Sequence, residues 1–243
     1  MIVSENITGN FMIFQDNNKF KAGTDAVLLA SFAGIKKSDV AADFCSGTGA
    51  VGFLSFLRCS QKHTIFVDID NEMIELSKKT AEFNGVSDKF SFIASDITAC
   101  NIKNDSIDYI TVNPPYFREN SGKTNKNQAL INARHAYKFS LNDLFKTSYK
   151  ILKDGGKIAL IQRTDYLADV IFEMKKNKIE PKRLRLVQSY SNKNANLFLL
   201  EGVKNGGIDL KCLPPLILYN ENGRTEEFKK TEKMGTKTWG FYI

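Results

Sequence analysis

Short apolar runs rich in β-branched and aromatic residues alternate along the chain with segments whose apolar positions recur every three to four residues. The first kind is typical of buried strands, and the second of helices packed on one side. Strands are predicted at residues 40–45, 64–69, 90–95, 107–113, 157–162, 182–188 and 196–201. Helices are predicted at residues 24–33, 50–57, 71–84, 141–152 and 165–176. This alternation predicts an α/β fold, with a parallel sheet covered by helices on both faces.

Two stretches interrupt the alternation. Residues 114–139, after the fourth predicted strand, have no clear periodicity, and a loop of that length in a compact domain is usually functional. Residues 202–243 hold a short apolar run and then a charged segment. We therefore expect one domain of three parts: an N-terminal segment at 1–23, a core at 24–201 and a packed C-terminal extension at 202–243. The aromatic residues of the N-terminal segment, interpreted as packing residues, are Phe11, Phe14 and Phe20.

The composition is that of a globular protein. Of 243 residues, 42% are hydrophobic and 25% charged, which excludes a disordered chain. No window approaches the ~20 apolar residues that cross a bilayer. Residues 1–14 also lack a signal-peptide layout, so we expect a cytoplasmic protein without a membrane partner. The 34 Lys and Arg against 27 Asp and Glu leave a net charge of +7, which favours a polyanionic partner.

Few residues are available for metal or nucleophilic chemistry. The four cysteines form no CxxC pair, and the histidines are His63 and His135. A zinc site would need nearly all of these side chains to converge, so no metal is expected. The scarcity of histidine also disfavours a Ser-His-Asp hydrolase. Cys45 is interpreted as a small residue at a strand end and not as a nucleophile.

A glycine-rich turn follows the first predicted core strand. Gly47, Gly49 and Gly52 have the spacing of a nucleotide-binding fingerprint, in which glycines let the backbone approach a ligand at a helix start. Asp68 lies 68 − 47 = 21 residues beyond Gly47, where such folds place an acid that holds a ribose hydroxyl. NAD and S-adenosylmethionine both fit this pattern. Asp43, four residues before Gly47, favours the second, because a carboxylate can hold an ammonium group and has no evident role beside a pyrophosphate.

A third acid, Asp96, follows the next predicted strand. An acid there can accept a hydrogen bond from an adenine amine, while its apolar neighbour Ile97 covers the ring. Acids at three successive strand ends share one edge of a parallel sheet, and ligands of open parallel sheets bind beyond the carboxyl ends of the strands. The three acids therefore predict a nucleoside-type ligand at this edge.

The fourth predicted strand ends in Asn113-Pro114-Pro115-Tyr116. The two prolines fix the backbone and remove two N–H donors, so that carbonyl groups remain as acceptors. The Asn113 side-chain oxygen is a further acceptor, and Tyr116 offers an aromatic face. Two acceptors and a stacking surface suit a planar amine, whose nitrogen lone pair can then face an electrophilic methyl group at roughly 3–3.5 Å. This motif indicates the transfer of a methyl group to such an amine.

Taken together, these motifs resemble those of class I S-adenosylmethionine-dependent amino-methyltransferases. Two flanking segments, residues 21–29 and Leu213-Pro214-Pro215-Leu216, extend the resemblance to the bacterial tRNA1(Val) adenine-37 N6-methyltransferase family over nearly the whole chain. The resemblance implies a Rossmann-like fold with a seven-stranded, mostly parallel sheet, an antiparallel last strand and helices on both faces. It also implies that the cofactor is S-adenosylmethionine and that the substrate is tRNA, methylated at N6 of an adenosine beside the anticodon.

The resemblance assigns a role to each matching residue. Residues expected to hold the cofactor are Lys21, Gly23, Thr24, Asp43, Gly47, Gly49, Asp68, Asp96, Ile97 and Asn113. Residues expected to hold the target base are Asn113, Pro114, Pro115 and Tyr116. The family more often has Glu where this chain has Asp68, and Asp70 lies two residues further on, so both remain candidates for the ribose ligand, with Asp68 preferred.

The long loop after this motif carries residues that suit RNA phosphates, since it leaves the catalytic strand end. These residues are Arg118, Lys123, Lys126, Arg134 and His135. We expect a monomer. Alternatives that stay open are methylation of another planar amine, in rRNA or a protein glutamine, and a non-catalytic RNA-binding protein on this fold. An NAD-dependent oxidoreductase is disfavoured, because it has no role for residues 113–116.

Overall fold

The computed structural model describes residues 2–8, 10–16, 23–114 and 140–234. The strands of its main sheet are β3 (Val40–Phe44), β4 (His63–Asp68), β5 (Phe90–Ala94), β6 (Ile107–Val112), β7 (Leu152–Arg163), β8 (Ile179–Gln188), β9 (Leu197–Lys204), β10 (Lys211–Cys212) and β11 (Leu216–Ile217). The helices are α1 (Thr24–Phe32), α2 (Ala50–Cys59), α3 (Asn71–Phe83), α5 (Leu141–Ile151), α6 (Leu167–Lys176) and α7 (Glu226–Met234), with short 3-10 turns η1 (Ser87–Lys89) and η2 (Thr164–Tyr166).

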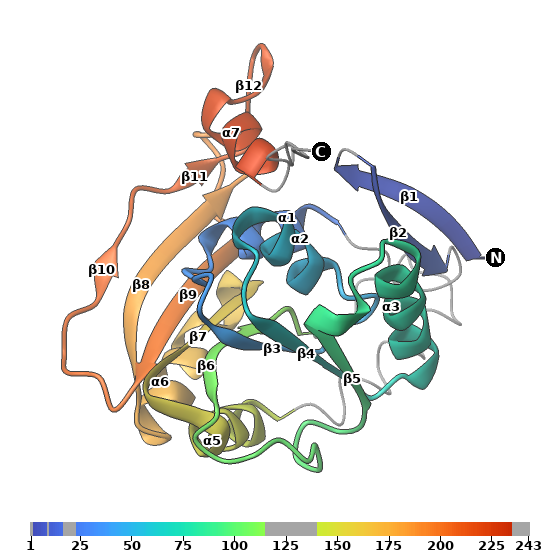
Figure 1. Cartoon of the computed structure of the whole chain (residues 1–243). Helices are drawn as coiled ribbons and strands as arrows, with labels where there is room; N and C mark the ends of the chain where they lie inside the picture. Colours follow the sequence, from blue (N-terminus) through green and yellow to red (C-terminus); the bar gives the residue numbers. More distant parts are fainter. Residues whose placement is uncertain (1, 9, 17–22, 115–139, 235–243) are drawn as a thin grey trace, which may run out of the picture.

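The strand order of this sheet is β10-β8-β9-β7-β6-β3-β4-β5, and β11 also pairs with β8 (Figure 1). Strands β5, β4, β3, β6 and β7 are parallel, whereas β9 lies antiparallel between β7 and β8. The seven longer strands confirm the predicted fold class, including the antiparallel last strand. The sheet extends beyond seven strands because β10 and β11 pair with the edge of β8, whose backbone groups would otherwise face solvent.

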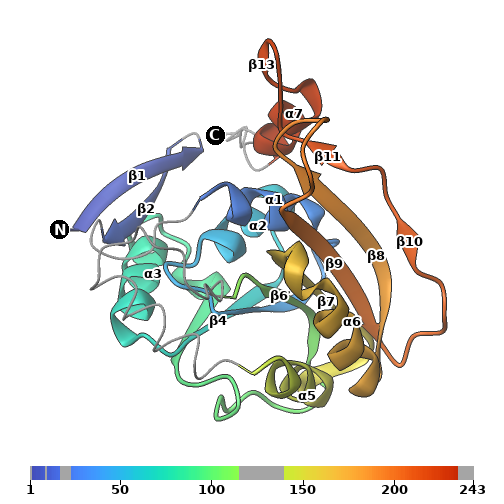
Figure 2. The ribbon, with the colours of Figure 1, turned by 180° about the vertical axis from the view of Figure 1, so that it is seen from behind.

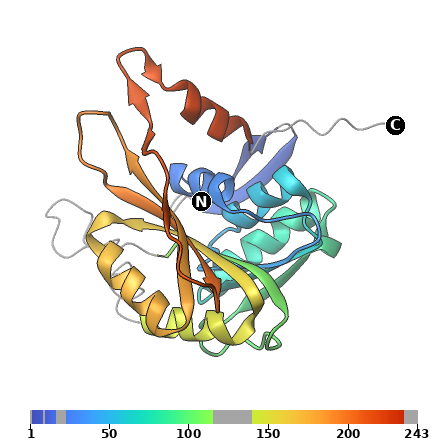
Figure 3. The same ribbon diagram turned by 90° about the vertical axis from the view of Figure 1, so that its left-hand side faces the viewer.

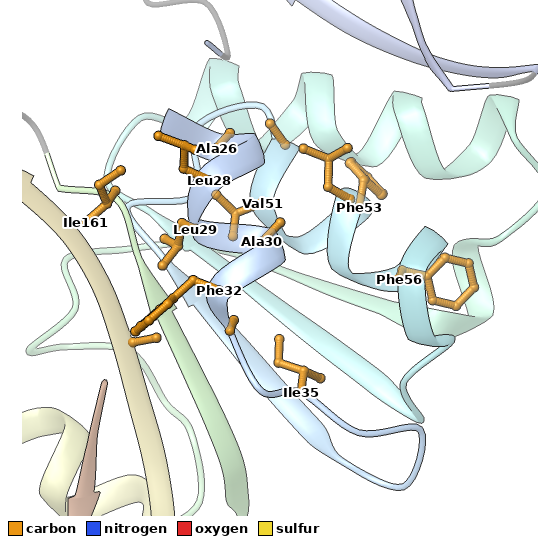
Figure 4. Close-up of a cluster of buried hydrophobic side chains, with 14 of the residues drawn as sticks. Ala26, Leu28, Leu29, Ala30, Phe32, Ile35, Val51, Phe53, Phe56 and Ile161 are labelled. Carbon is orange, nitrogen blue, oxygen red and sulfur yellow. The ribbon is translucent and has the colours of Figure 1, made fainter. Parts of the chain in front are cut away.

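Helices cover both faces of the sheet (Figure 2). One core cluster joins α1, α2, α3 and α7 to the sheet, and a second joins α5 and α6 to the opposite face. Figure 4 shows α1 and α2 side by side, with Ala26 and Val51 near one end and Phe32 and Phe56 nearer the other. The two helices pack against each other, and each follows a glycine at its N-cap, Gly23 for α1 and Gly49 for α2.

The strands and helices lie close to the predicted ranges, with two informative differences. Strand β7 begins at Leu152, five residues before its expected start, and includes the glycine pair Gly155 and Gly156. Gly155 adopts a positive φ of 71° there, which glycine allows without strain. Strand β9 continues to Lys204, past the expected core boundary at residue 201.

The N-terminal segment contains a hairpin that was not predicted, formed by antiparallel strands β1 (Ile2–Thr8) and β2 (Phe11–Asp16). The Asn84 side chain, after α3, pairs with the backbone of Met12: it accepts from the N–H at 3.0 Å and donates to the carbonyl at 2.7 Å. Thr80 accepts from the Phe14 N–H at 3.0 Å. Phe11 is buried and its ring centroid lies 5.5 Å from that of Phe53. Phe20 lies outside the described residues.

The C-terminal extension is fixed along β8. The Leu213 N–H donates to the Leu184 carbonyl at 2.8 Å, and the Arg185 Nε donates to the Pro214 carbonyl at 3.0 Å. Leu216 and Phe228 are buried against the α1 side of the sheet. A small hairpin of β12 (Tyr219–Asn220) and β13 (Gly223–Arg224) connects β11 to α7 and projects from the molecule (Figure 3).

Candidate active site

The acids singled out in the sequence converge at the carboxyl ends of the parallel strands. In the sheet register Asp43 on β3 pairs with Thr111 on β6, and Asp68 on β4 pairs with Ala94 on β5. Asp96 follows β5 by two residues, and Asn113 directly follows β6. One edge of the sheet therefore carries three carboxylates and the Asn113 amide.

Asp43 is held by two buried hydrogen bonds. Its Oδ1 accepts from the Thr111 hydroxyl at 2.6 Å, and its Oδ2 accepts from the Gly52 N–H, near the start of α2, at 3.1 Å. The Asp43 side chain thus ties β3 to β6 and to the helix after the glycine-rich turn. Asp43 is only 1% exposed, so its carboxyl has lost almost all of its water.

This burial changes the protonation of Asp43. Desolvation raises the pKa of the Asp43 carboxyl to about 7, although the bonds from Thr111 and Gly52 favour the charged form. The pKa of the Cys45 thiol is also raised, first by desolvation and then by the carboxylates of Asp68, Asp43 and Asp96. Cys45 is therefore a thiol at neutral pH and poorly suited to be a nucleophile. All three carboxylates raise the pKa of this one thiol, which is consistent with their lying close together around Cys45.

The glycine-rich turn needs glycine for two different reasons. Gly47 and Gly49 have φ angles of 53° and 81°, in the left-handed region. No described atom lies within 4 Å of the place where a Cβ of Gly47 would point, so the backbone there stands open to a ligand. At Gly52 a Cβ would lie 2.1 Å from the Phe66 ring. Gly52 therefore serves the packing of α2 on the sheet.

Asp68 and Asp70 have different surroundings. The Asp68 Oδ2 accepts from the Gly47 N–H at 2.7 Å, which places this carboxylate against the glycine-rich turn. The Asp70 Oδ1 accepts from the N–H groups of Glu72 and Met73 at 2.9 and 3.4 Å. Asp70 is therefore the N-cap of α3. Asp68 therefore lies at the glycine-rich turn, whereas the Asp70 carboxylate is used in capping α3.

The other described residues predicted to hold the cofactor are more exposed than Asp43. The Asp96 Oδ1 accepts from the Thr98 N–H at 2.8 Å and from the Thr98 hydroxyl at 2.7 Å. Ile97 is half-buried against the α5 side of the core. Gly23 is the N-cap residue of α1, and Thr24 begins that helix. Both Gly23 and Thr24 are exposed.

Asn113 and Pro114 come directly after β6, next to the strand that carries Asp43. Asn113 is partly exposed, whereas Pro114 is buried. The other predicted residues of the catalytic motif, the loop and the preceding segment lie outside the described residues. They are Lys21, Pro115, Tyr116, Arg118, Lys123, Lys126, Arg134 and His135.

Thr111 was not singled out in the sequence, although it is 2% exposed and donates to the Asp43 carboxylate. The sequence did contain a signal for Thr111. A buried carboxylate on a central strand needs hydrogen-bond donors, and a threonine on an adjacent strand can supply one. The strand order that makes β6 the neighbour of β3 was needed to find it. Asp70 carried a clearer signal, since an Asp just before a helical segment is a preferred N-cap.

The residues at this edge suit a cofactor with an ammonium group and a ribose. The open backbone at Gly47 provides room, and the carboxylates of Asp43 and Asp68 provide acceptors beside it. Among the described residues, no group of three or more His, Cys, Asp or Glu side chains is arranged to hold a metal ion. In the same part of the chain, no helix is both long and apolar enough to cross a membrane.

Solved structures share this fold. A predicted O-methyltransferase from Agrobacterium tumefaciens matches with a TM-score of 0.71 at 20% identity, over 87% of this chain and 97% of that one. A geranyl diphosphate C-methyltransferase from Streptomyces coelicolor, solved with S-adenosyl-L-homocysteine, matches with a TM-score of 0.55 at 13% identity, over 74% of each chain. The sheet order and these matches show the Rossmann-like fold of class I methyltransferases.

The chain belongs to the methyltransferase small domain family, whose family model matches residues 14–180. A relative from Porphyromonas gingivalis is 26% identical over 199 residues, which cover 79% of this chain and 77% of the relative. A relative from Trichodesmium erythraeum is 32% identical over 160 residues, covering 62% of this chain and 64% of the relative. Both relatives are named tRNA1(Val) (adenine(37)-N6)-methyltransferase, which agrees with the family resemblance seen in the sequence.

Proposed function

We propose that this protein methylates N6 of an adenosine in tRNA, at position 37 beside the anticodon, with S-adenosylmethionine as the methyl donor. The observation that carries the proposal is the placement of Asn113 at the end of β6, beside the strand that bears Asp43. The residue that would bind the amine and the residue that would bind the ammonium group thus come from adjacent strands, β6 and β3. The names of the relatives support the substrate, and the protein then acts in the cytoplasm, where tRNA is modified.

In this proposal the cofactor lies along the ends of β3, β4 and β5. Asp43 holds the ammonium group, the backbone at Gly47 and Gly49 faces the methionine portion, and Asp68 holds the ribose. The Asp96 carboxylate and the Ile97 side chain hold the adenine. Gly23 and Thr24, at the start of α1, would contact the same cofactor, and Lys21 is close to them in the sequence.

S-adenosylmethionine supplies an electrophilic methyl group, and the chain's own residues prepare the amine that receives it. The Asn113 side-chain oxygen and the Pro114 carbonyl accept hydrogen bonds from the adenine N6–H groups. These bonds draw the nitrogen away from conjugation with the ring, so that its lone pair is directed at the methyl carbon. Tyr116 stacks on the base, and Pro115 keeps the turn rigid. No general base is needed for the attack, because the methylated nitrogen sheds its proton afterwards.

The anticodon loop suits this site physically. A base in a loop is unpaired, so moving it into a pocket costs less than extracting it from a duplex. Basic residues of the loop after the catalytic motif would contact phosphates near the target. These residues are Arg118, Lys123, Lys126, Arg134 and His135.

The test is incubation of the protein with labelled S-adenosylmethionine and bulk unmodified tRNA, followed by digestion and mass spectrometry of the nucleosides. We expect N6-methyladenosine. Label in another nucleoside would contradict adenine as the target base, whereas S-adenosylmethionine would remain the methyl donor. An unlabelled tRNA, despite measured cofactor binding, would contradict the tRNA substrate and favour rRNA or protein glutamine instead.

A further inference from the structure

The proposed cofactor acids occupy only half of the carboxyl edge. Asp43, Asp68 and Asp96 follow β3, β4 and β5, which lie on one side of β6. On the other side of β6 the same edge is formed by the end of β7, the end of β8 and the loop at 189–196 that connects β8 to β9. Given the proposed function, this second half is not used by the cofactor and is open to the RNA substrate.

The β8–β9 loop is held in place by hydrogen bonds at three points. The Thr164 hydroxyl, just after β7, donates to the Ala195 carbonyl at 2.9 Å. The Gln188 Nε2 donates to the Lys193 carbonyl at 2.8 Å. The Tyr219 N–H, in the β12–β13 hairpin, donates to the Ser189 carbonyl at 2.9 Å. The loop is therefore a prearranged surface, and it lies beside the hairpin (Figure 3).

Two tyrosines meet where the loop and the hairpin join. The ring centroids of Tyr190 and Tyr219 are 5.8 Å apart, and the Tyr219 ring meets the buried Phe228 edge-on at 6.0 Å. Tyr219 is thus anchored to the core through α7. Tyr190 lies further out and is 45% exposed. An aromatic ring supported from below and open above is suited to stack on a flat partner.

The surroundings of Tyr190 are polar and lack negative charge on the loop side. Residues 188–200 contain no Asp or Glu, and the loop consists of Ser, Asn, Ala and Lys193 besides Tyr190. On the hairpin side, Arg224 lies 5.8 Å over the Phe228 ring and pairs with Glu232 at 3.3 Å. Amide, hydroxyl and cationic groups around one exposed ring match the phosphates and bases of an RNA strand better than an apolar protein partner.

We propose that Tyr190, Lys193, Tyr219 and Arg224, here called the Tyr190 surface, bind the RNA substrate, with Tyr190 stacking on an unpaired base close to the target nucleotide. β8 is separated from β6 by three strand spacings, and in the sheet register the end of β6 at Val112 is level with Leu184, so the end of β8 at Gln188 lies roughly 20 Å from the end of β6. A short single-stranded segment such as an anticodon loop spans that distance. Lys193 and Arg224 then face the phosphates on either side of the stacked base.

The test measures binding of an unmodified tRNA transcript by fluorescence anisotropy. Because base stacking on one aromatic ring contributes a large share of single-strand affinity, Tyr190→Ala should raise the Kd by about 5- to 100-fold. Tyr190→Phe should stay within about twofold, since it keeps the ring. Lys193→Ala should weaken binding and lower the slope of log K against log salt by about 0.7–0.9. Phe172→Ala is the matched control, because Phe172 is 63% exposed on α6 and lies outside the Tyr190 surface.

Equal tRNA affinity of the Tyr190→Ala and Phe172→Ala proteins would overturn this surface. If the wild-type protein methylates tRNA while Tyr190→Ala binds it normally, the surface is wrong and the proposed function stands. If the wild-type protein neither binds nor methylates tRNA, the proposed function fails and the surface fails with it. Affinity for S-adenosylhomocysteine should be the same in all variants, which confirms that each one is folded.

Discussion

Asp43 shows how one buried side chain can set the working pH of the site. Its carboxyl has a pKa of about 7, because burial removes water from the charged form. An ammonium group bound beside it favours the carboxylate, so binding below this pKa releases a proton. Cofactor affinity should therefore rise with pH and level off once the carboxyl is ionised.

We expect the Kd for S-adenosylhomocysteine, which carries the same ammonium group, to fall by up to about tenfold per pH unit between pH 5 and 7. Isothermal titration calorimetry checks this. Asp43→Asn should bind more weakly and show no such slope. A slope that persists in Asp43→Asn would show that another group titrates.

Substitution of Thr111 is a second test of how the surroundings of Asp43 set the pKa of its carboxyl. Its hydroxyl bond lowers the pKa of Asp43, so Thr111→Val should raise that pKa and shift the pH profile of cofactor affinity upwards. At pH 7 the loss should be about 10-fold or more, because hydrogen bonds to charged groups contribute ~1.5–3 kcal/mol. Thr231→Val, which removes a threonine hydroxyl that bonds the Glu227 carbonyl within α7, is the control for losing a threonine hydroxyl. An unshifted profile in Thr111→Val would show that its bond does not tune Asp43.

Asn113 is expected to act mainly on the reaction and to contribute little to cofactor affinity, although it borders the cofactor as well as the target base. Asn113→Ala should slow single-turnover methylation by about 10²- to 10³-fold, the range seen when one positioned polar group is removed from an active site. Its Kd for S-adenosylhomocysteine should stay within about twofold of the wild type. Asn101→Ala, at an exposed asparagine before β6, is the matched control. Unchanged turnover at saturating tRNA would refute the role of Asn113.

At the scale of elements, helix α2 can lie on β4 only because residue 52 is glycine. A Cβ there would meet the Phe66 ring, which is itself packed against Phe53 and Phe90 at centroid distances of 4.9 and 5.3 Å. Because this aromatic cluster has no room to yield, Gly52→Ala should lower the free energy of unfolding by about 1–3 kcal/mol. Urea denaturation measures this.

The control for Gly52→Ala is Gly207→Ala, since no described atom lies within 4 Å of the place where its Cβ would point. Its effect on unfolding should be within about 0.5 kcal/mol. A Gly52→Ala protein as stable as Gly207→Ala would mean that α2 shifts at little cost. The contact between α2 at Gly52 and the Phe66 ring would then not be tightly packed.

For the molecule as a whole, the C-terminal extension closes the edge of the sheet. β10 and β11 pair with β8, and Phe228 on α7 is 1% exposed against the α1 side of the core. Phe228→Ala should weaken this attachment by about 3–5 kcal/mol, since it removes a large buried ring. Limited proteolysis should then cut between residues 205 and 225 faster than in the wild type. Lys230→Ala, on the exposed side of α7, should be cut at the wild-type rate, and equal rates for both variants would contradict this attachment.

Most of the fold followed from local patterns. The ends of the seven long strands and of the five core helices were predicted to within a few residues. Hydrophobic periodicity and the signals that end a helix depend on residues close together in the sequence, so both can be recognised without the structure. The β1–β2 hairpin was missed, although the dipeptide Gly9-Asn10 is typical of a two-residue hairpin turn, because residues 2–8 before it are mostly polar. Strands β10 and β11 are two residues each, too short to produce a period, and they exist only because β8 offers them an edge.

The sequence by itself determined the class of fold, the glycine-rich turn and the residues that would choose the reaction, because each of these depends on neighbouring positions in the chain. Only the tertiary structure decided which partners those residues have. Thr111 meets Asp43 across 68 positions, and Asn84 meets Met12 across 72. Tyr190 meets Tyr219 through the pairing of the extension with β8. Such contacts depend on strand order and register, which are set by packing between distant segments and not by any local pattern.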